Sequence, residues 1–285
     1  MDSIRHEYPL QLICEVMQIS RSSFYEWSNK VTYQIKAKNS MTEQKVVAVF
    51  KAHKRRYGVR RIVAELSHQK LETSPYMVRK CLASNGLKAI QPRSFVPRTT
   101  DSRHPYPISP NYLRDRKFPE AINQVWVGDI TYIPMAAGNF RYLSVWMDIC
   151  SRKIVGWDLQ DHMRESLVSA SLSKALRARK TSTGMMIHSD RGGQYAGQQF
   201  RSILHQHNLT QSMSDADNPY DNAHMESFFS RFKAELLQGG SFQNAEDSQS
   251  QIFEFIEMYY NPSRLHSSIG YLSPNNFENK ANEDN

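Results

Sequence analysis

The pattern of hydrophobic and polar positions divides the chain into a helical first part and a second part in which strands alternate with helices. In the first part, residues 8–29 predict two short helices, with a turn at Gln18-Ile19 and Ser20 as the cap of the second. One face of the first helix carries three apolar residues: Leu12, Ile13 and Val16.

This outline is typical of a helix–turn–helix, whose second helix presents side chains to base edges. Arg21, Ser22 and Ser23 lie at the start of that second helix and are candidate DNA contacts. An ordinary helical hairpin produces the same pattern, so the motif alone does not decide between the two.

Residues 42–88 predict a second helical unit that contains the basic stretch HKRRYGVRRIVAEL. Ser74-Pro75 is a favourable helix start, and Gly86 lies where that helix should end. Four arginines of the basic stretch are candidate DNA contacts: Arg55, Arg56, Arg60 and Arg61. Residues 91–120 are rich in proline and basic residues, which predicts an extended linker that is either a spacer or a track for a phosphate backbone.

From residue 121 the pattern predicts an α/β arrangement, with a sheet covered by helices. The predicted strands are 124–133, 140–149, 153–159, 184–190 and 210–214. The predicted helices are 165–180, 196–209, 223–237 and 248–261. The chain is therefore expected to comprise five segments: a helix-turn-helix segment (1–40), a basic helical domain that is a candidate for DNA binding (41–90), a linker (91–120), an α/β core (121–240) and a C-terminal helical extension of the core (241–285).

Charge separates the two parts further. Lys and Arg outnumber Asp and Glu by 22 to 10 in residues 1–120, whereas the acids prevail by 18 to 14 in residues 121–285, within a net charge of +8. A basic module joined to an acidic one indicates an anion-binding part, and nucleic acid is its commonest partner. A lysine-rich helical domain without such a partner is the alternative.

The remaining composition narrows the class of protein. No apolar run is long enough to span a membrane, and the N-terminus does not resemble a signal peptide, which predicts a soluble, cytoplasmic protein. Cys14, Cys81 and Cys150 are odd in number and far apart, so we expect free thiols and neither a disulfide framework nor a zinc site.

Three acids occupy positions where carboxylates are costly or well placed for chemistry. Asp129 interrupts an apolar strand, Asp190 follows the fourth strand just before Arg191-Gly192-Gly193, and Glu226 lies within a helix. Two Asp and one Glu are hard oxygen ligands suited to Mg²⁺ or Mn²⁺. Such a set can hold two ions about 3.5–4 Å apart, which predicts a metal-dependent active site.

The acids and their surroundings resemble a known family. The spacing of 35 residues between Asp190 and Glu226, with Asp129 upstream, resembles the Asp-Asp-Glu triad of retroviral integrases. More closely, the chain resembles the second-frame transposases (OrfB) of bacterial insertion sequences of the family typified by insertion sequence three. The matching stretches are RYGVRRI (56–62), VWVGDIT (125–131), HSDRGGQY (188–195), PYDNAHMESFFSRFKAE (219–235) and YYNPSRLHSSIGYLSP (259–274).

The resemblance implies an RNase H-like core, two divalent ions held by the three acids, and DNA cleavage at element ends followed by transfer of the freed 3′-hydroxyl to target DNA. It also implies a homo-oligomer on double-stranded DNA. An upstream-frame protein, or a frameshift fusion with it, is a possible partner, and no membrane is involved. There are two rival functions: a catalytically inactive DNA-binding regulator and a nuclease for RNA–DNA hybrids. The three intact acids argue against the first, and the basic helix–turn–helix part of the chain argues against the second.

Other residues gain candidate roles from the same resemblance. Lys233, seven residues after Glu226, matches a basic residue that contacts terminal DNA, although an exposed helix lysine is the plain alternative. Asn222 is a candidate DNA contact and is also expected to cap the helix of Glu226, to orient that residue, or both. His188 is either a residue supporting the site or a hydrogen-bonded core histidine.

One stretch departs from the family pattern. Ala216-Asp217 stands where related chains commonly have Lys-Gly, which replaces a positive, flexible step by a negative one. Asp215 and Asp217 are expected to belong to a mobile loop, with Asp221-Asn222 setting the start of the following helix.

Overall fold

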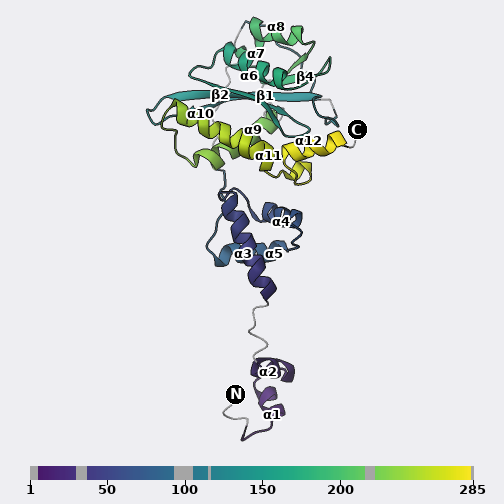
Figure 1. Cartoon of the computed structure of the whole chain (residues 1–285), viewed down its shortest axis with the longest axis vertical. Coiled ribbons are helices and arrows are strands. Elements are labelled where there is room, and N and C mark those ends of the chain that lie inside the picture. The colour runs from purple at the N-terminus through teal and green to yellow at the C-terminus, as the bar shows by residue number, and fades with distance from the viewer. Residues whose placement is uncertain (1–5, 30–36, 93–104, 115–116, 216–221, 284–285) are drawn as a thin grey trace.

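The computed structural model describes residues 6–29, 37–92, 105–114, 117–215 and 222–283. Of residues 37–40 only the backbone is described. These residues form a pair of short helices, a three-helix domain and an α/β core (Figure 1). No helix in the described ranges has the length and apolar character needed to cross a membrane. Ala216, Asp217 and Asp221 lie outside the described residues.

The first pair consists of α1 (Leu10–Val16) and α2 (Arg21–Ser28). Ser20 caps α2 as predicted, because its Oγ accepts a hydrogen bond from Ser23 N at 3.0 Å. Of the three apolar residues on one face of α1, Leu12 and Val16 are 47% and 74% exposed. Ile13 and Cys14 are buried instead, since a helix of two turns buries only the edge that meets its neighbour.

The three-helix domain is built from α3 (Ala37–Ala52), α4 (Val59–His68) and α5 (Pro75–Ser84). Ser74 caps α5 by accepting a hydrogen bond from Met77 N, and Gly86 follows its end with a φ of +64°, as the sequence predicted. One apolar cluster joins the three helices and includes Phe50, Ile62, Leu66 and Val78.

The core contains a five-stranded mixed sheet in the order β3-β2-β1-β4-β5. Its strands are β1 (Val125–Pro134), β2 (Phe140–Asp148), β3 (Ile154–Gln160), β4 (Met186–Ser189) and β5 (Thr210–Met213). The first three strands form an antiparallel meander, whereas β4 runs parallel to β1 and β5 parallel to β4. The predicted strands are confirmed.

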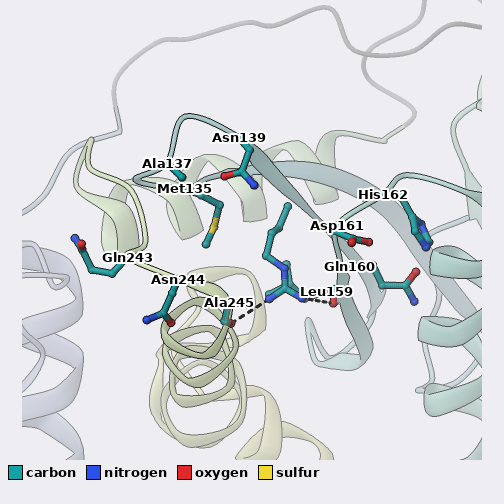
Figure 2. Close-up of a pocket in the computed structure, with 11 residues that line it drawn as sticks. Met135, Ala137, Asn139, Leu159, Gln160, Asp161, His162, Gln243, Asn244 and Ala245 are labelled. Atoms are coloured by element: carbon teal, nitrogen blue, oxygen red, sulfur yellow. Dashed lines mark hydrogen bonds between the residues drawn. The ribbon is translucent and has the colours of Figure 1, made fainter.

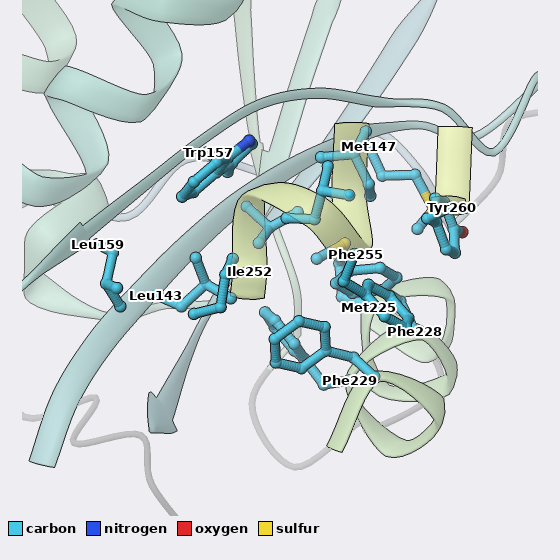
Figure 3. Close-up of a cluster of buried hydrophobic side chains, with 14 of the residues drawn as sticks. Leu143, Met147, Trp157, Leu159, Met225, Phe228, Phe229, Ile252, Phe255 and Tyr260 are labelled. Atoms are coloured by element: carbon cyan, nitrogen blue, oxygen red, sulfur yellow. The ribbon is translucent and has the colours of Figure 1, made fainter. Parts of the chain in front are cut away.

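Helices cover both faces of the sheet (Figure 1). One face carries α6 (Glu165–Ala178), α7 (Gly193–Ala196) and α8 (Gln198–Gln206). The other carries α9 (Ala223–Phe232), η3 (Lys233–Leu237), α10 (Ala245–Phe253), η4 (Glu254–Tyr260), α11 (Asn261–Ser263), the 3₁₀ turn η5 (Ser267–Ile269) and α12 (Pro274–Glu283). Figure 3 shows Met225, Phe228 and Phe229 of α9 packed with Phe255 and Tyr260.

Two predicted helices change their winding. The helices expected at 223–237 and 248–261 each begin as α-helix and continue as π-helix, in η3 and η4 respectively. A π turn makes i→i+5 hydrogen bonds and is seldom visible in a hydrophobic pattern. Each π segment carries an acid that forms an ion pair with a residue distant in the chain: Glu235 of η3 pairs with Arg264, and Glu254 of η4 pairs with Lys54.

The three-helix domain docks on the C-terminal segment of the core. The Tyr57 hydroxyl donates to Ser263 O at 3.1 Å and accepts from Leu265 N at 2.9 Å. Leu265 also joins the apolar cluster of the three-helix domain. The contact therefore combines directed hydrogen bonds with apolar burial, and it links residues about 200 positions apart in the chain.

Two histidines make this contact sensitive to acid. Burial, aided by nearby Arg56 and Arg61 and opposed by Glu65, lowers the pKa of His53. Burial, then Arg264, Arg61 and Arg152, holds the pKa of His266 well below its usual range. The folded chain therefore binds protons at these two histidines less readily than the unfolded chain, whose imidazoles titrate near pH 6.5. His266, the more deeply buried of the two, can remove up to about 1.4 kcal/mol of stability per pH unit as pH falls below that value, and His53 acts in the same direction.

We expect the thermal unfolding midpoint to fall between pH 7.5 and 5.5, and to fall less in His266→Gln. Calorimetry of both proteins across this range measures the difference, which isolates His266 from the carboxylates that also titrate. An identical pH dependence in the two proteins would contradict this assignment.

Candidate active site

The parallel pairing of β1 and β4 brings two of the predicted acids together. Val127 of β1 pairs with His188 of β4. Asp129, in the middle of β1, and Asp190, just after the end of β4, each lie two residues beyond this pair, so both point to the same side of the sheet. Gly128 precedes Asp129 because a Cβ there would lie 2.3 Å from the Trp146 ring.

The turn after β4 holds Asp190 in place. Asp190 Oδ1 accepts a hydrogen bond from Gly192 N at 2.9 Å. A Cβ at Gly192 would approach Gln194 Oε1 to 2.7 Å and Asp190 Oδ1 to 3.1 Å, which explains the small residue in this turn. The sequence Asp-Arg-Gly-Gly therefore allows the chain to fold back tightly beside the carboxylate.

Glu226 comes to the same region on α9. Four side chains fix this helix against the sheet: Met225, Phe228, Phe229 and Phe232 are all buried. Glu226 lies on the opposite, exposed side, and Lys233 follows at the end of α9, half-buried. The amphipathic pattern of α9 thus determines which way both charged side chains face.

The charges of Asp190, Glu226 and Lys233 all act on the carboxyl of Asp129. Burial and then the charge of Asp190 raise the pKa of Asp129 well above its usual range, and Glu226 adds to the effect. The Ile130 N–H, which donates to Asp129 Oδ1 at 2.7 Å, and the charge of Lys233 act in the opposite direction. Burial lowers the pKa of Lys233, and Asp129 partly restores it. The site is therefore short of positive charge.

Tyr195 is a neighbour of the acids that sequence reasoning missed. Its ring packs edge-on against Trp146 and Phe200, and its buried hydroxyl has no hydrogen-bond partner among the described residues. Burial, Asp190 and Asp129 hold its pKa well above the usual range. Its position in HSDRGGQY was the available signal.

The donor chemistry of the site fits a divalent cation. Asp129, Asp190 and Glu226 supply hard oxygen donors, which suit Mg²⁺ or Mn²⁺, and Lys233 is the nearby counter-charge. The spacing is wider than a closed metal site: within the described ranges, no three His, Cys, Asp or Glu side chains come close enough together to hold an ion. In this structure the three acids therefore do not form a closed metal site.

The structure corrects the predicted role of Asn222. It occupies the N-cap position of α9, but its side chain does not cap the helix. Instead its Nδ2 donates to Gly128 O at 3.4 Å, and the residue is 8% exposed. Asn222 therefore ties the start of α9 to the residue before Asp129, and its burial leaves little surface for DNA.

His188 is a hydrogen-bonded core histidine, the second of its two predicted roles. Its Nδ1 lies 2.9 Å from Ser212 Oγ and its Nε2 lies 3.1 Å from Ser214 Oγ.

Asp215 differs from the prediction of a mobile loop residue. Its carboxylate pairs with Arg114 at 3.0 Å and Arg191 at 3.2 Å, which anchors the chain after β5.

The four arginines of the basic stretch face different ways. Arg55 and Arg60 are exposed, as a DNA contact requires. The Arg56 guanidinium instead lies over the rings of Phe255 and Tyr259, at 5.1 and 4.4 Å from their centroids. Arg61 Nε donates to Leu265 O at 2.9 Å. Contrary to the prediction, the guanidinium groups of Arg56 and Arg61 contact residues of the core in this structure.

The three-helix domain contains a helix–turn–helix that the sequence did not single out. Here α4 is the first helix and α5 the second, which is the helix that enters the major groove in such motifs. Tyr76 on α5 is 66% exposed, and Arg79 and Lys80 are exposed as well. On α2, Arg21 and Ser22 are exposed too.

A separate polar hollow of about 600 Å³ lies between the β1–β2 turn and the start of α10 (Figure 2). Arg141 crosses it and donates to Ala245 O and Leu159 O, each at 3.1 Å. None of the three acids lines it. The hollow is thus distinct from the site of the acids.

Comparison with known families agrees with this division of the chain. Residues 119–219 and 226–281 match families described as integrase core domain, and residues 37–95 match an HTH-like domain. The mixed five-stranded sheet with helices on both faces is the RNase H-like fold of such cores. Fold and site therefore define an integrase-type core preceded by a helical DNA-binding domain.

Curated relatives identify the family more closely. "Transposase InsF for insertion sequence IS3A" of Escherichia coli K12 is 36% identical over 277 residues, which cover 96% of this chain and 95% of the relative. "Transposase for insertion sequence element IS904" of Lactococcus lactis is 37% identical and covers 82% of this chain and 92% of the relative. The chain belongs to the IS3 family of insertion-sequence transposases.

Solved integrases are more distant. The HTLV-2 integrase catalytic core domain in complex with magnesium is 12% identical, with a TM-score of 0.42, over 54% of this chain and 95% of that one. The catalytic core domain of BIV integrase is 14% identical, with a TM-score of 0.42, over 57% of this chain and 97% of that one.

Proposed function

We propose that this transposase hydrolyses a phosphodiester at the end of its element and then joins the freed 3′-hydroxyl to target DNA, using Asp129, Asp190 and Glu226. Two observations carry the proposal: the parallel pairing of β1 with β4 brings Asp129 and Asp190 to the same side of the sheet, and the charge of Glu226 acts on Asp129. Three carboxylates around one partly buried position, deficient in positive charge, are suited to divalent ions and poorly suited to bare phosphate.

Each residue has a defined part. Asp129 and Asp190 hold the fixed side of the site, since one is in the sheet and the other in the tight turn after it. Glu226 completes the ligand set from α9, and Lys233 offers its ammonium to DNA phosphate. Bound Mg²⁺ or Mn²⁺, as two ions, would activate the attacking oxygen and stabilise the leaving one. Positioning and charge carry the rate, so no side-chain nucleophile is required.

DNA binding is assigned first to the three-helix domain, with α5 as the helix in the groove and Arg55, Arg60, Arg21 and Ser22 as further contacts. We expect the double variant Arg79→Ala/Lys80→Ala to weaken end binding and to lower the slope of log K against log salt by about two. Fluorescence anisotropy with end duplexes over a range of salt concentrations measures both quantities.

Lys180→Ala/Lys280→Ala removes the same charge from exposed positions of the core and serves as the matched control. We expect its salt slope to match that of the unmodified chain. An unchanged slope in the α5 variant would remove α5 from the DNA interface without touching the assignment of the acids.

The decisive test incubates the chain with duplexes of its own element ends and Mg²⁺, and follows both nicking and joining. A catalytically inactive regulator would bind the ends and leave every strand intact. A nuclease of RNA–DNA hybrids would cut a hybrid arm in preference to duplex DNA. Metal-dependent nicking and joining of duplex ends is the outcome that we expect.

The same assay addresses the partners. Transposition joins two element ends, so we infer a homo-oligomer assembled on DNA, which light scattering with and without end duplexes measures. Running the reaction with the chain alone and with the chain fused to the upstream frame shows whether that partner is needed for activity.

A further inference from the structure

A buried ion pair joins the helix of Glu226 to the C-terminal segment. Arg264 Nε and Nη2 donate to Glu235 Oε2 and Oε1 at 3.0 and 2.6 Å, and both side chains are 3% exposed. A bidentate pair of this kind fixes the relative position of two backbones in a way that apolar packing alone does not. Its place in the fold therefore matters.

Glu235 lies in η3, which continues α9 without a break. Lys233 is two residues before it, and Glu226 is carried by the same run of helix. Aromatic contacts pack this run on η4: Phe228 lies 5.1 Å from Tyr260 and Phe232 lies 5.2 Å from Phe255, centroid to centroid. The packed rings hold the two helices against each other. The directed Arg264–Glu235 pair also fixes how far one helix can slide along the other.

Arg264 is held from the other side by the three-helix domain. The two residues that flank it in sequence are the ones that dock this domain, since Ser263 O and Leu265 N bond to the Tyr57 hydroxyl and Leu265 O accepts from Arg61. A continuous polar connection thus runs from Tyr57, through residues 263–265 and the buried pair, to the helix of Glu226 and Lys233.

We propose that Glu235 and Arg264 are positioning residues that, anchored by Tyr57, hold Glu226 and Lys233 in place against Asp129 and Asp190. The proposal rests on the proposed function of the three acids. It assigns a role in catalysis to the docking of the DNA-binding domain: with the domain seated, α9 and η3 are held in the position that the reaction needs. Neither positioning residue touches the DNA or the reacting atoms.

The test compares full-length variants on end duplexes with Mg²⁺. Glu235→Met/Arg264→Met replaces both charges by apolar side chains, an exchange that buried pairs often tolerate without loss of stability. Tyr57→Phe removes only the hydroxyl and leaves the ion pair in place. We expect both variants to bind ends within twofold of the unmodified chain. At saturating duplex we expect at least a tenfold slower nicking rate and a higher Mg²⁺ concentration for half-maximal rate.

A control separates positioning from general loosening of the docked domain. Lys54→Ala removes an exposed ion pair with Glu254 at the same contact but outside the polar connection, and we expect its nicking rate to stay within twofold. Thermal unfolding identifies an assay temperature at which every variant is folded.

Two results would overturn the proposal. One is a fully active double-methionine variant with an unchanged Mg²⁺ requirement, which would leave the pair a structural element only. The other is an unmodified nicking rate in Tyr57→Phe, which would remove the link to the three-helix domain and can be read even if the double variant does not fold. In both cases the unmodified chain still cuts; failure of the proposed function would show as an unmodified chain that cuts nothing.

Discussion

Asp190→Asn is expected to lower the rates of nicking and joining by about a thousandfold or more, which corresponds to roughly 4 kcal/mol in the activation free energy. Asparagine keeps the oxygen that accepts from Gly192 N, so the turn after β4 should be retained. It removes one negative charge from the ligand set and one of the charges that raise the pKa of Asp129. Single-turnover assays on end duplexes measure the loss.

The same substitution should leave folding intact and even raise the unfolding temperature near neutral pH, because it relieves repulsion between Asp129 and Asp190. Asp161→Asn, which removes an exposed carboxylate far from the three acids in the sequence, is the matched control and should cut at the normal rate. Full activity of Asp190→Asn would eliminate the assignment of the three acids.

Arg264→Ala is expected to cost about 3–5 kcal/mol in the free energy of unfolding, because it leaves the Glu235 carboxylate buried without its partner. The loss also includes the cation–π contact with Tyr260, whose ring centroid lies 5.7 Å from the guanidinium carbon. Urea unfolding followed by tryptophan fluorescence measures the change. An effect below about 1 kcal/mol, the scale of an exposed pair, would show that water reaches Glu235.

Lys54→Ala provides the comparison for stability as well. Its partner Glu254 and Lys54 itself are 62% and 63% exposed, so we expect a loss of at most about 1 kcal/mol. The contrast between the two variants separates the buried pair from ordinary surface electrostatics.

Local pattern predicted the sheet and the place of the acids in it. Alternation and turn residues were sufficient for the strands, because strand formation and tight turns depend on near neighbours. An aspartate within an apolar strand and another at the end of a buried strand were conspicuous for the same reason. Assigning Glu226 required the family spacing, since one acid on an amphipathic helix is ordinary.

What the sequence did not predict depends on contacts between distant residues. Arg56 and Arg61 read as part of a basic DNA-binding stretch, yet they meet residues 255–265, and no local pattern encodes that encounter. The α5 helix was predicted, but its place as the second helix of a helix–turn–helix was not, because its exposed basic residues are few. Asn222 had the right identity for a cap, but its Nδ2 donates to Gly128 O and its Oδ1 accepts no hydrogen bond from the helix.

The pairing of Val127 with His188 has a consequence for how chains of this kind can diverge in length. Because ladder hydrogen bonds align β1 with β4 just before the two aspartates, the 60 residues between Asp129 and Asp190 are free to gain or lose loop segments without separating the carboxylates. A single residue inserted between Val127 and Asp129 would instead turn the aspartate to the opposite face of the sheet. Insertions should therefore accumulate in the hairpin turns and around α6. The stretches from Val127 to Asp129 and from His188 to Asp190 should keep constant length.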